Sequence, residues 1–466
     1  MNRANKLSAS VVGLAGNISL QKHVLKASFR MALLIGLTGA ALAESPQRLP
    51  PGGRTRAVAA TTPPGAALQP PEAAEKRLRE VYQLAADARS QEALRKAQSL
   101  VKDYPHFQLA QLVYGDLLSA RNGPVRTIGD VPSALLKQAM PALTNLREES
   151  RLRMAALKER PREGAIPEQF VALSAETRHA IAVDGAKSRL YLFENGPGGM
   201  RLIADFYSSI GKAGLEKNVE GDSRTPLGVY FITGTFSSKT LGDFYGAGAL
   251  PINYPNMLDR KRGKTGTGIW LHGTPMASYS RPPLDTNGCV VLSNPDLMRV
   301  MQTVEAGSTT PVVIASQLQW VMPDSVKPAG KAFDAFLNTW KSAKASGNVE
   351  RMLDSYASDF NSYGRTLKDW RVVLEGGVGK LKGRTLELKN VSMLHWVDSA
   401  DTMVVTFDEM ANNAPLGTTT RQYWSRQGGQ WKIFFEGPIS RPVDSQRFEQ
   451  RAFKSPMAVR TAALLP

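Results

Sequence analysis

One cysteine and one histidine lie close together in this sequence of 466 residues. Cys289 is the only cysteine, and His272 is the one histidine of five that shares a short, glycine-marked stretch with it. A free thiol has a pKa of about 8.5, so it needs a base to act as a nucleophile near neutral pH. The pair therefore predicts acyl transfer, with Cys289 as the nucleophile and His272 as its base.

Two glycines stand next to these residues. Gly273 permits an abrupt turn after a strand that ends at His272, and Gly288 lets the backbone approach a scissile carbonyl just before the nucleophile. The N–H groups of Gly288 and Cys289 are expected to form the oxyanion site. In the alternative interpretation Cys289 is a buried structural residue near an unrelated histidine, and the glycines with their spacing argue against it.

Other polar residues in the region are candidates for holding a substrate. Arg281 lies between base and nucleophile, where a guanidinium can bind a carboxylate in a bidentate way, although a solvated loop arginine is equally consistent. Thr286 either orients the cysteine turn or only caps it. Asp222, Arg224 and Tyr245 are weaker candidates for the wall of the substrate site.

The beginning of the chain is typical of an exported protein. Residues 1–43 contain a basic leader, an apolar run and the small-x-small pattern Ala41-Leu42-Ala43, which predict a signal peptide and a periplasmic location. An uncleaved anchor helix is the alternative. Residues 44–71 are rich in proline and alanine and are expected to be a disordered linker.

Composition narrows the classes of partner. A single cysteine excludes an internal disulfide in an oxidising compartment. The net charge of +17 suits attraction to an anionic cell envelope, or it reflects solvated surface lysines and arginines. Nucleic acid is not expected as a partner, since the chain is exported and has no basic stripe interleaved with aromatic residues.

Hydrophobic periodicity divides the rest of the chain into domains. Residues 72–165 show helical spacing and are expected to form an α-helical domain, either with one tetratricopeptide-like hairpin or as a plain bundle. Residues 178–316 contain short β-type runs separated by glycine turns, which predict a mainly-β sandwich or barrel. This second domain carries Cys289 and His272.

A third domain is expected over residues 329–445, after a proline-containing linker near 322–328 and before a tail at 446–466. Two helical stripes precede four strand-like runs, with Gly428-Gly429 as a hairpin turn, so the domain is predicted to be α+β. The pattern resembles the nuclear transport factor 2-like (SnoaL-like) fold, a cone whose sheet wraps around a pocket. Such domains often bind ligands or form dimers, which makes a homodimer through the terminal domains one expectation.

The stretch around the cysteine resembles the catalytic domain of YkuD-like L,D-transpeptidases. The resemblance rests on His272-Gly273, then Thr286, one residue, Gly288 and Cys289, and on the upstream segment EGDSRTPLGVYFI. It implies a β-rich fold, Cys289 as the acyl-enzyme nucleophile, and His272 as a base held by a backbone carbonyl, that of Gly273. It also implies that neither a metal nor an organic cofactor is needed.

Two positions differ from the commoner pattern of that family. Asn287 stands where a second histidine is usual, and Val291 stands where an arginine is frequent, and both concern substrate positioning and the choice of acceptor. The phrases GDFYGAGALPINYPN, WLHGTP and SRPP resemble the YafK-like murein-lipoprotein amidase branch. The three-part layout is similar to that of the L,D-carboxypeptidases that set helical cell shape.

Together these features predict an enzyme that acts on peptidoglycan stem peptides. Cys289 is expected to attack the carbonyl of the third stem residue, expel the terminal D-alanine and pass the acyl group to an amine. With water as acceptor, the same residues would make an L,D-carboxypeptidase or an amidase that releases murein lipoprotein. A different class also stays open, namely a catalytically inactive scaffold that binds the cell wall.

Overall fold

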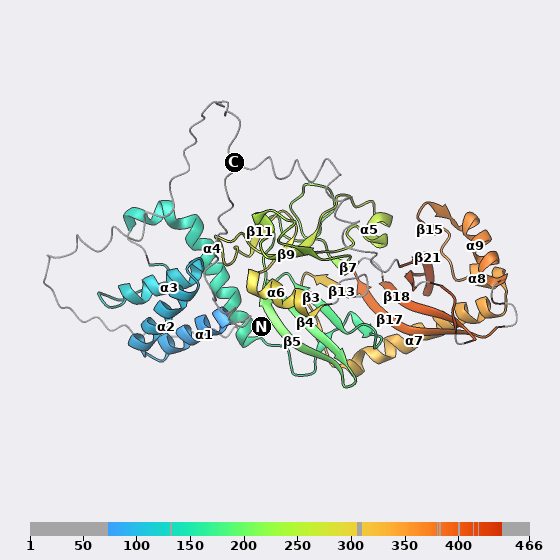
Figure 1. Cartoon of the computed structure of the whole chain (residues 1–466), viewed down its shortest axis with the longest axis horizontal. Coiled ribbons are helices and arrows are strands. Elements are labelled where there is room, and N and C mark those ends of the chain that lie inside the picture. Colours follow the sequence, from blue (N-terminus) through green and yellow to red (C-terminus); the bar gives the residue numbers. More distant parts are fainter. Residues whose placement is uncertain are drawn as a thin grey trace, which may run out of the picture. The chain divides into compact units, whose positions relative to one another are not determined.

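The computed structural model describes residues 73–130, 133–304, 310–379, 381, 384–398, 401–412, 414–417 and 419–439. All of them belong to one compact unit of the chain (Figure 1). The expected leader, linker and C-terminal tail lie outside the described residues. Among the helices that are described, none is long and apolar enough to cross a membrane.

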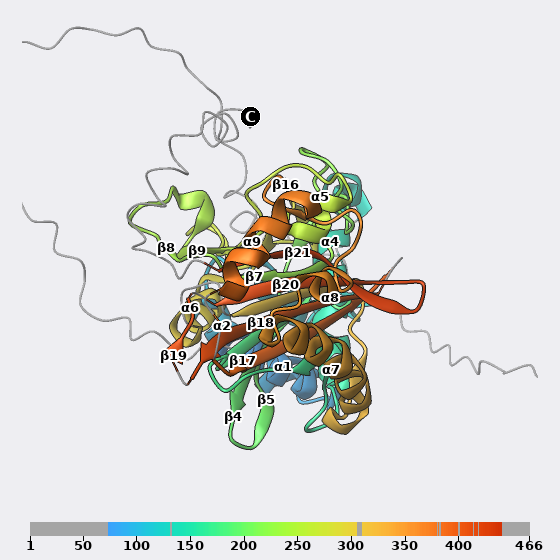
Figure 2. The ribbon, with the colours of Figure 1, turned by 90° about the vertical axis from the view of Figure 1, so that its right-hand side faces the viewer.

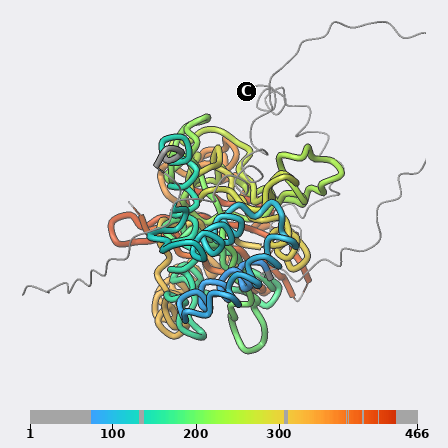
Figure 3. Tube along the Cα trace, turned by 90° about the vertical axis from the view of Figure 1, so that its left-hand side faces the viewer, coloured from blue at the N-terminus to red at the C-terminus, as the bar shows by residue number. Residues whose placement is uncertain are grey.

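The first domain is α-helical, as expected. Its helices are α1 (Ala73–Ala86), α2 (Ser90–Asp103), α3 (Gln108–Ser119) and α4 (Ser133–Lys158). Apolar residues at helical spacing, such as Leu78, Leu100 and Leu109, meet in one core. Phe107, in the turn between α2 and α3, is fully buried in this core. Figure 3 views the chain from the side of these helices, which are drawn in blue (α1 to α3) and teal (α4).

The second domain is built on a five-stranded sheet. Its strand order is β5 (Gly199–Tyr207), β4 (Arg189–Gly196), β3 (His179–Asp184), β13 (Pro311–Ala315) and β7 (Gly228–Phe231). β3 and β13 run parallel, and the other neighbours are antiparallel. The alternate residues Ile181 and Val183 of β3 lie on the face that packs against the second sheet.

The second sheet carries the residues of chemical interest. Its order is β12 (Val290–Val291), β10 (Trp270–His272), β9 (Gly248–Pro251) and β8 (Phe236–Ser237). Leu271 and Val290 are fully buried in the core between the two sheets. The domain is therefore a mainly-β structure with a packed interior. Its remaining elements are β1 (Ile166–Pro167), β6 (Ile210–Gly211), η1 (Asp243–Tyr245), α5 (Met257–Lys261), β11 (Leu284–Thr286), α6 (Asn294–Thr303) and β14 (Trp320–Val321).

The third domain places helices on one face of an antiparallel sheet (Figure 2). The helices are α7 (Pro323–Ala345), α8 (Val349–Leu353) and α9 (Leu367–Gly379). The strands are β17 (Leu386–Val397), β18 (Asp401–Ala411), β20 (Thr420–Gln427) and β21 (Gln430–Pro438), with the short β15 (Asn361–Ser362), β16 (Arg365–Thr366) and β19 (Ala414–Pro415). Gly428 and Gly429 both have positive φ and form the two-residue turn between β20 and β21, as the sequence predicts.

The linker expected near residues 322–328 is not a linker. Helix α7 begins at Pro323 and runs through Pro328. Proline suits the first turn of a helix, because the N–H group that it lacks has no partner there in any case. Pro323 therefore marks a helix start, Pro328 lies inside the same helix, and the second domain passes directly into the third.

The second and third domains share a sheet and a core. β2 (Phe170–Ala172), which precedes the catalytic strands in the chain, pairs with β17 at the edge of the third domain's sheet. One hydrophobic core contains Phe193 and Phe231 of the second domain together with Tyr423 and Phe434 of the third. We conclude that these two domains support each other's folding.

Phe170 tests this shared core. Its side chain is 2% exposed and packs edge-on against Phe193 with ring centroids 5.5 Å apart. We expect Phe170→Ala to lower the free energy of unfolding by about 3–5 kcal/mol, because it leaves a cavity at the junction. In urea denaturation, far-UV circular dichroism and tryptophan fluorescence should shift together. Leu118→Ala, at a half-exposed site, serves as the control, and two separate transitions in the Phe170 variant would contradict a shared core.

Candidate active site

Neighbouring strands bring the cysteine and the histidine to the same part of the second sheet. β10 and β12 are parallel, with Leu271 opposite Val290 and His272 opposite Val291. Cys289 directly precedes β12, and its Sγ lies 3.5 Å from the carbonyl oxygen of Gly268, just before β10. The strand pairing therefore sets the thiol beside the strand that ends in the imidazole.

The turn before Cys289 is fixed by two buried threonines. Thr286 Oγ1 donates to the Cys289 carbonyl at 2.7 Å, and Thr225 Oγ1 donates to the Gly288 carbonyl at 2.9 Å. Gly288 has a φ of +123°, and a Cβ there would lie 2.6 Å from the carbonyl oxygen of Arg224. Only glycine fits this position, so its presence is explained by close backbone packing.

The same turn bears on the expected oxyanion site. The N–H of Gly288 donates to Thr286 Oγ1 at 3.0 Å, so this donor is already engaged. The sequence predicts that the N–H groups of Gly288 and Cys289 bind the oxyanion. The Gly288 N–H could do so only by breaking its hydrogen bond to Thr286 or sharing it with the substrate. Thr286 thus orients the cysteine turn through both a donated and an accepted hydrogen bond.

His272 is held in one tautomer. Its Nδ1 lies 2.7 Å from the carbonyl oxygen of Gly273, and because a carbonyl only accepts, Nδ1 carries the proton. Nε2 is then unprotonated and able to accept a proton. The side chain is 1% exposed, and burial lowers the pKa of His272 to about 4, with the charge of Arg281 acting in the same direction.

Asn294 holds the backbone next to Gly273, the residue whose carbonyl binds His272. Its Nδ2 donates to the Thr274 carbonyl at 2.8 Å, and its Oδ1 accepts from the Ala247 N–H at 2.8 Å. A Cβ on Gly273 or on Gly246 would lie 2.1 Å from this Oδ1. Gly273 is therefore needed because the Asn294 amide fills the space beside it.

Two aromatic side chains lie next to the His272 ring. The ring of Tyr245 lies 5.2 Å from the His272 ring, and the ring of Phe244 lies 5.7 Å from it, measured between centroids. The guanidinium of Arg281 stands 4.8 Å above the Phe244 ring. Burial raises the pKa of Tyr245, and the charge of a Cys289 thiolate raises it further, so the phenol stays neutral beside the sulfur.

The thiol of Cys289 is also neutral at rest. Burial raises its pKa to about 11, while the Trp270 N–H and the charges of Arg281 and Lys217 lower it in part. With the imidazole uncharged as well, the pair is a thiol next to a neutral base. Proton transfer must therefore accompany any attack by the sulfur.

The other residues singled out from the sequence lie in different settings. Asn287 is exposed next to the turn. Asp222 binds Lys217 Nζ at 2.8 Å and accepts from three backbone N–H groups, and its pKa falls to about 2 despite partial burial. Arg224 donates to the Leu215 carbonyl. Asp222 and Arg224 thus stabilise their own loop.

A family model for the L,D-transpeptidase catalytic domain (YkuD) matches residues 178–314, and a second model, for the Cds6 C-terminal NTF2-like domain, matches residues 332–437. The chain contains an L,D-transpeptidase catalytic domain followed by an NTF2-like domain. This is the architecture that the resemblance implied. No curated protein matches the chain significantly in sequence.

Some solved structures are similar to parts of this chain. Bd1075 of Bdellovibrio bacteriovorus is 24% identical, with a TM-score of 0.50 over 60% of this chain and all of that one. Pgp2 of Campylobacter jejuni, titled a helical cell shape determining protein, is 19% identical, with a TM-score of 0.46 over 63% of this chain and all of that one. An L,D-transpeptidase from Xylanimonas cellulosilytica is 19% identical, with a TM-score of 0.21 over 35% of this chain and 69% of that one.

Sequence reasoning missed Asn294 in this L,D-transpeptidase domain. The segment Ser293-Asn294-Pro295-Asp296 is a helix start, with the Ser293 side chain accepting from the Asp296 N–H. That local function explains the serine, proline and aspartate but leaves the asparagine unassigned. The sequence did hold one signal for its role. Asn294 lies in the first turn of the helix, and its amide is not needed for capping because Ser293 makes the cap. Among the described residues, no cluster of three metal-binding side chains was found.

A double-mutant cycle tests the contact between Gly273 and Asn294. We expect Gly273→Ala to lower the free energy of unfolding by about 1–3 kcal/mol, because its methyl group overlaps the Asn294 amide. In an Asn294→Ala background the same change should cost less, giving a coupling of about 1 kcal/mol or more in urea denaturation. Strictly additive costs would show that the two positions do not interact.

Alkylation of the single cysteine tests the neutral state of the pair. Because the thiol pKa is raised to about 11, the thiolate fraction grows with pH throughout the neutral range. The rate constant with iodoacetamide should therefore rise about tenfold for each pH unit between about pH 7 and pH 9. Mass spectrometry of the intact protein measures it. A rate that is level below pH 7 would instead indicate a thiolate–imidazolium pair.

Proposed function

We propose that the chain is a peptidoglycan-modifying L,D-transpeptidase in which Cys289 forms an acyl-enzyme with a stem peptide. The observation that carries the proposal is the pairing of β10 with β12 in an L,D-transpeptidase catalytic domain: Cys289 directly precedes β12, and β10 ends at His272, whose imidazole is held in one tautomer. The substrate is a stem peptide whose third-residue carbonyl is attacked. Export to the periplasm follows from the leader that the sequence predicts.

The acylation step begins with a proton transfer. As the sulfur approaches the carbonyl carbon, the thiol proton passes to Nε2 of His272. The Nδ1–H of the same ring stays hydrogen-bonded to the Gly273 carbonyl. The S–C bond forms, and the tetrahedral intermediate collapses with loss of the terminal D-alanine. The imidazolium returns its proton to the departing amine. His272 is then neutral again and ready to activate the acceptor.

Donors near the sulfur stabilise the charge that develops. The Trp270 N–H lowers the pKa of Cys289 and so favours the thiolate at the start of the attack. The Cys289 N–H and the neutral phenol of Tyr245 are the donors that we assign to the oxyanion. The phenol suits this role because its raised pKa keeps the proton on the oxygen.

Arg281 is the residue that we assign to the substrate's terminal carboxylate. Its charge acts on both Cys289 and His272, so the guanidinium belongs to the same site. Its Nη1 donates to the Asp285 carbonyl at 3.3 Å, and stacking on the half-exposed Phe244 ring leaves the other donors at the edge of the guanidinium plane. A stem peptide that ends in a free carboxylate would then be bound with its scissile carbonyl toward the sulfur.

The acceptor decides which reaction completes the cycle, and an amine is our leading proposal. Incubation with disaccharide tetrapeptide, followed by mass spectrometry of the products, separates the possibilities. Cross-linked dimer indicates transfer to an amine, and tripeptide alone indicates an L,D-carboxypeptidase. Release of protein from lipoprotein-linked muropeptides would indicate an amidase. Failure to form any product, together with inertness of Cys289 toward a carbapenem, would exclude an enzyme.

Variants of the pair test the assignment of their functions. We expect Cys289→Ala to abolish product formation, and His272→Ala to lower kcat by about 10²–10⁴, because proton transfer then lacks its base. Unchanged activity in Cys289→Ala would refute the proposal. The control is Arg201→Ala, which removes an exposed side chain on the β4–β5 hairpin. If the protein is instead an inactive scaffold that binds the wall, a Cys289→Ala strain should have normal wall composition. Only deletion of the whole chain should then cause a defect.

A further inference from the structure

The loop between the base and the nucleophile is anchored on the helical domain. Tyr279, in the middle of this loop, packs its ring 4.3 Å from that of Phe107 and edge-on to that of Tyr104, in the turn between α2 and α3. Its N–H donates to the carbonyl of His106 at 3.2 Å. The loop thus contributes a side chain to the surface of the helical core.

The next residue of the loop is bound by helix α4. Ser280 Oγ donates to Glu149 Oε1 at 2.8 Å, and the same carboxylate oxygen accepts from Arg153 Nε and Nη2 at 3.0 and 2.8 Å. The side chains of Glu149 and Arg153 are 3% and 4% exposed. A buried carboxylate with such partners has little freedom to move, so it fixes the position of Ser280.

Arg281 itself is held through its backbone. The hydroxyl of Tyr207 donates to the Arg281 carbonyl at 2.9 Å, and the guanidinium of Arg153 lies 4.0 Å from the centre of the Tyr207 ring. Three consecutive residues, 279 to 281, are therefore fixed by or through the helical domain. The Arg281 side chain leaves this anchored stretch toward Phe244 and the active site.

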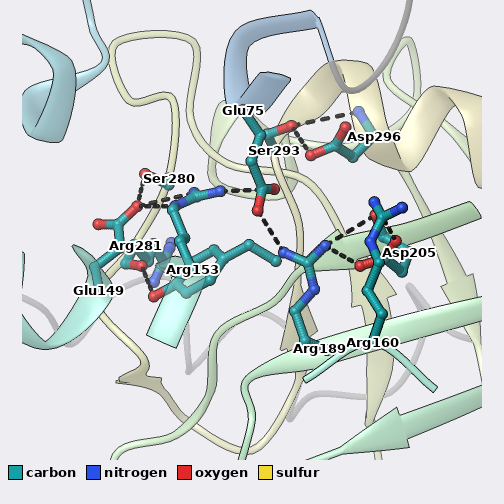
Figure 4. Close-up of polar contacts among 11 residues, drawn as sticks. Glu75, Glu149, Arg153, Arg160, Arg189, Asp205, Ser280, Arg281, Ser293 and Asp296 are labelled. Atoms are coloured by element: carbon teal, nitrogen blue, oxygen red, sulfur yellow. Dashed lines mark hydrogen bonds and ion pairs between the residues drawn. The ribbon is translucent and has the colours of Figure 1, made fainter. Parts of the chain in front are cut away.

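A buried ion network ties the anchor to the catalytic sheet (Figure 4). Arg153 binds Glu75 of α1 at 3.0 Å, Glu75 binds Arg189 of β4 at 2.7 Å, and Arg189 binds Asp205 of β5. Glu75 and Glu149 lie on opposite sides of Arg153 in the close-up. Because each charge has a partner in another element, a shift of α4 would leave a buried charge unpaired.

We propose that the helical domain is a positioning element of the active site, which sets the preference for substrates with a free terminal carboxylate by fixing Arg281. Glu149, Arg153, Tyr279 and Ser280 are the positioning residues, and they act through Arg281 without touching substrate. The proposal rests on the assignment of Arg281 to the substrate carboxylate. It gives the helical domain a function in substrate choice in addition to its contribution to folding.

The single cysteine allows a test that does not require peptidoglycan turnover. Iodoacetate and iodoacetamide alkylate Cys289 by the same displacement of iodide, but only iodoacetate carries a carboxylate. The ratio of their rate constants therefore reports the guanidinium near the thiol. We expect Glu149→Gln and Ser280→Ala to lower this ratio about three- to tenfold, toward the value of Arg281→Ala, as Coulomb attraction weakens with distance. The rate with iodoacetamide should change less, because it reports only the change in thiolate fraction that follows when Arg281 moves, and the ratio cancels that change.

Two further measurements separate positioning from general damage. Glu194→Gln breaks an exposed ion pair with Arg201 on the β4–β5 hairpin and should leave the ratio unchanged. With tetrapeptide substrates, Ser280→Ala should raise KM for the free acid, with kcat and the kinetics of the C-terminal amide little altered. A structural defect would instead reduce turnover of both substrates in parallel.

The outcomes that overturn the proposal are distinct from failure of the enzyme assignment. If Arg281→Ala lowers the ratio and neither Glu149→Gln nor Ser280→Ala does, the helical domain does not position Arg281. If Arg281→Ala has no effect, the guanidinium does not serve a carboxylate, and the proposal also falls. A responsive ratio in a protein without muropeptide activity would keep the positioning and refute the proposed reaction.

Discussion

The parallel pairing of β10 with β12 is the constraint on which the site depends. These strands have three and two residues, so neither would be stable without its neighbours and the core behind them. The core supplies that support through Leu271 and Val290, which are fully buried between the sheets. Once the two strands are fixed, the ends that carry Cys289 and His272 have little freedom. The sheet therefore sets where the two side chains lie. Gly273, Gly288 and the Asn294 amide then fix the turns that follow His272 and precede Cys289.

Burial acts on both members of the pair in the direction of the uncharged form. It raises the pKa of Cys289 and lowers that of His272, so the resting site stores no ion pair. This would benefit the exported protein that the leader sequence predicts, since its single cysteine would meet an oxidising compartment. A protonated thiol is a poor nucleophile toward disulfides and oxidants, so the residue is protected until a substrate brings its carbonyl to the sulfur.

Local sequence was sufficient for some features of this protein and insufficient for others. Cys289, His272 and their glycines could be found because residue type and spacing within one stretch carry the chemistry. Short β-type runs predicted the mainly-β second domain and the four long strands of the third, and the glycine pair predicted the β20–β21 turn. Asn294 could not be found, because its partners are backbone groups of two distant loops. The same holds for Tyr279 and Ser280, whose contacts with the helical domain join segments more than a hundred residues apart. The linker prediction near residues 322–328 was wrong because proline is compatible both with a linker and with the first turn of a helix, as at Pro323.

The pairing of β2 with β17 affects the order in which the last two domains can fold. β2 precedes the catalytic strands, and its partner β17 follows them, so the sheet of the NTF2-like domain is assembled from both sides of the catalytic domain. A ribosome releases β2 long before β17 exists. During that interval Phe170 has only part of its final surroundings, and the nascent catalytic domain carries an unpaired strand at its edge. The arrival of β17, rather than the completion of the catalytic domain, therefore marks the moment at which that edge is closed.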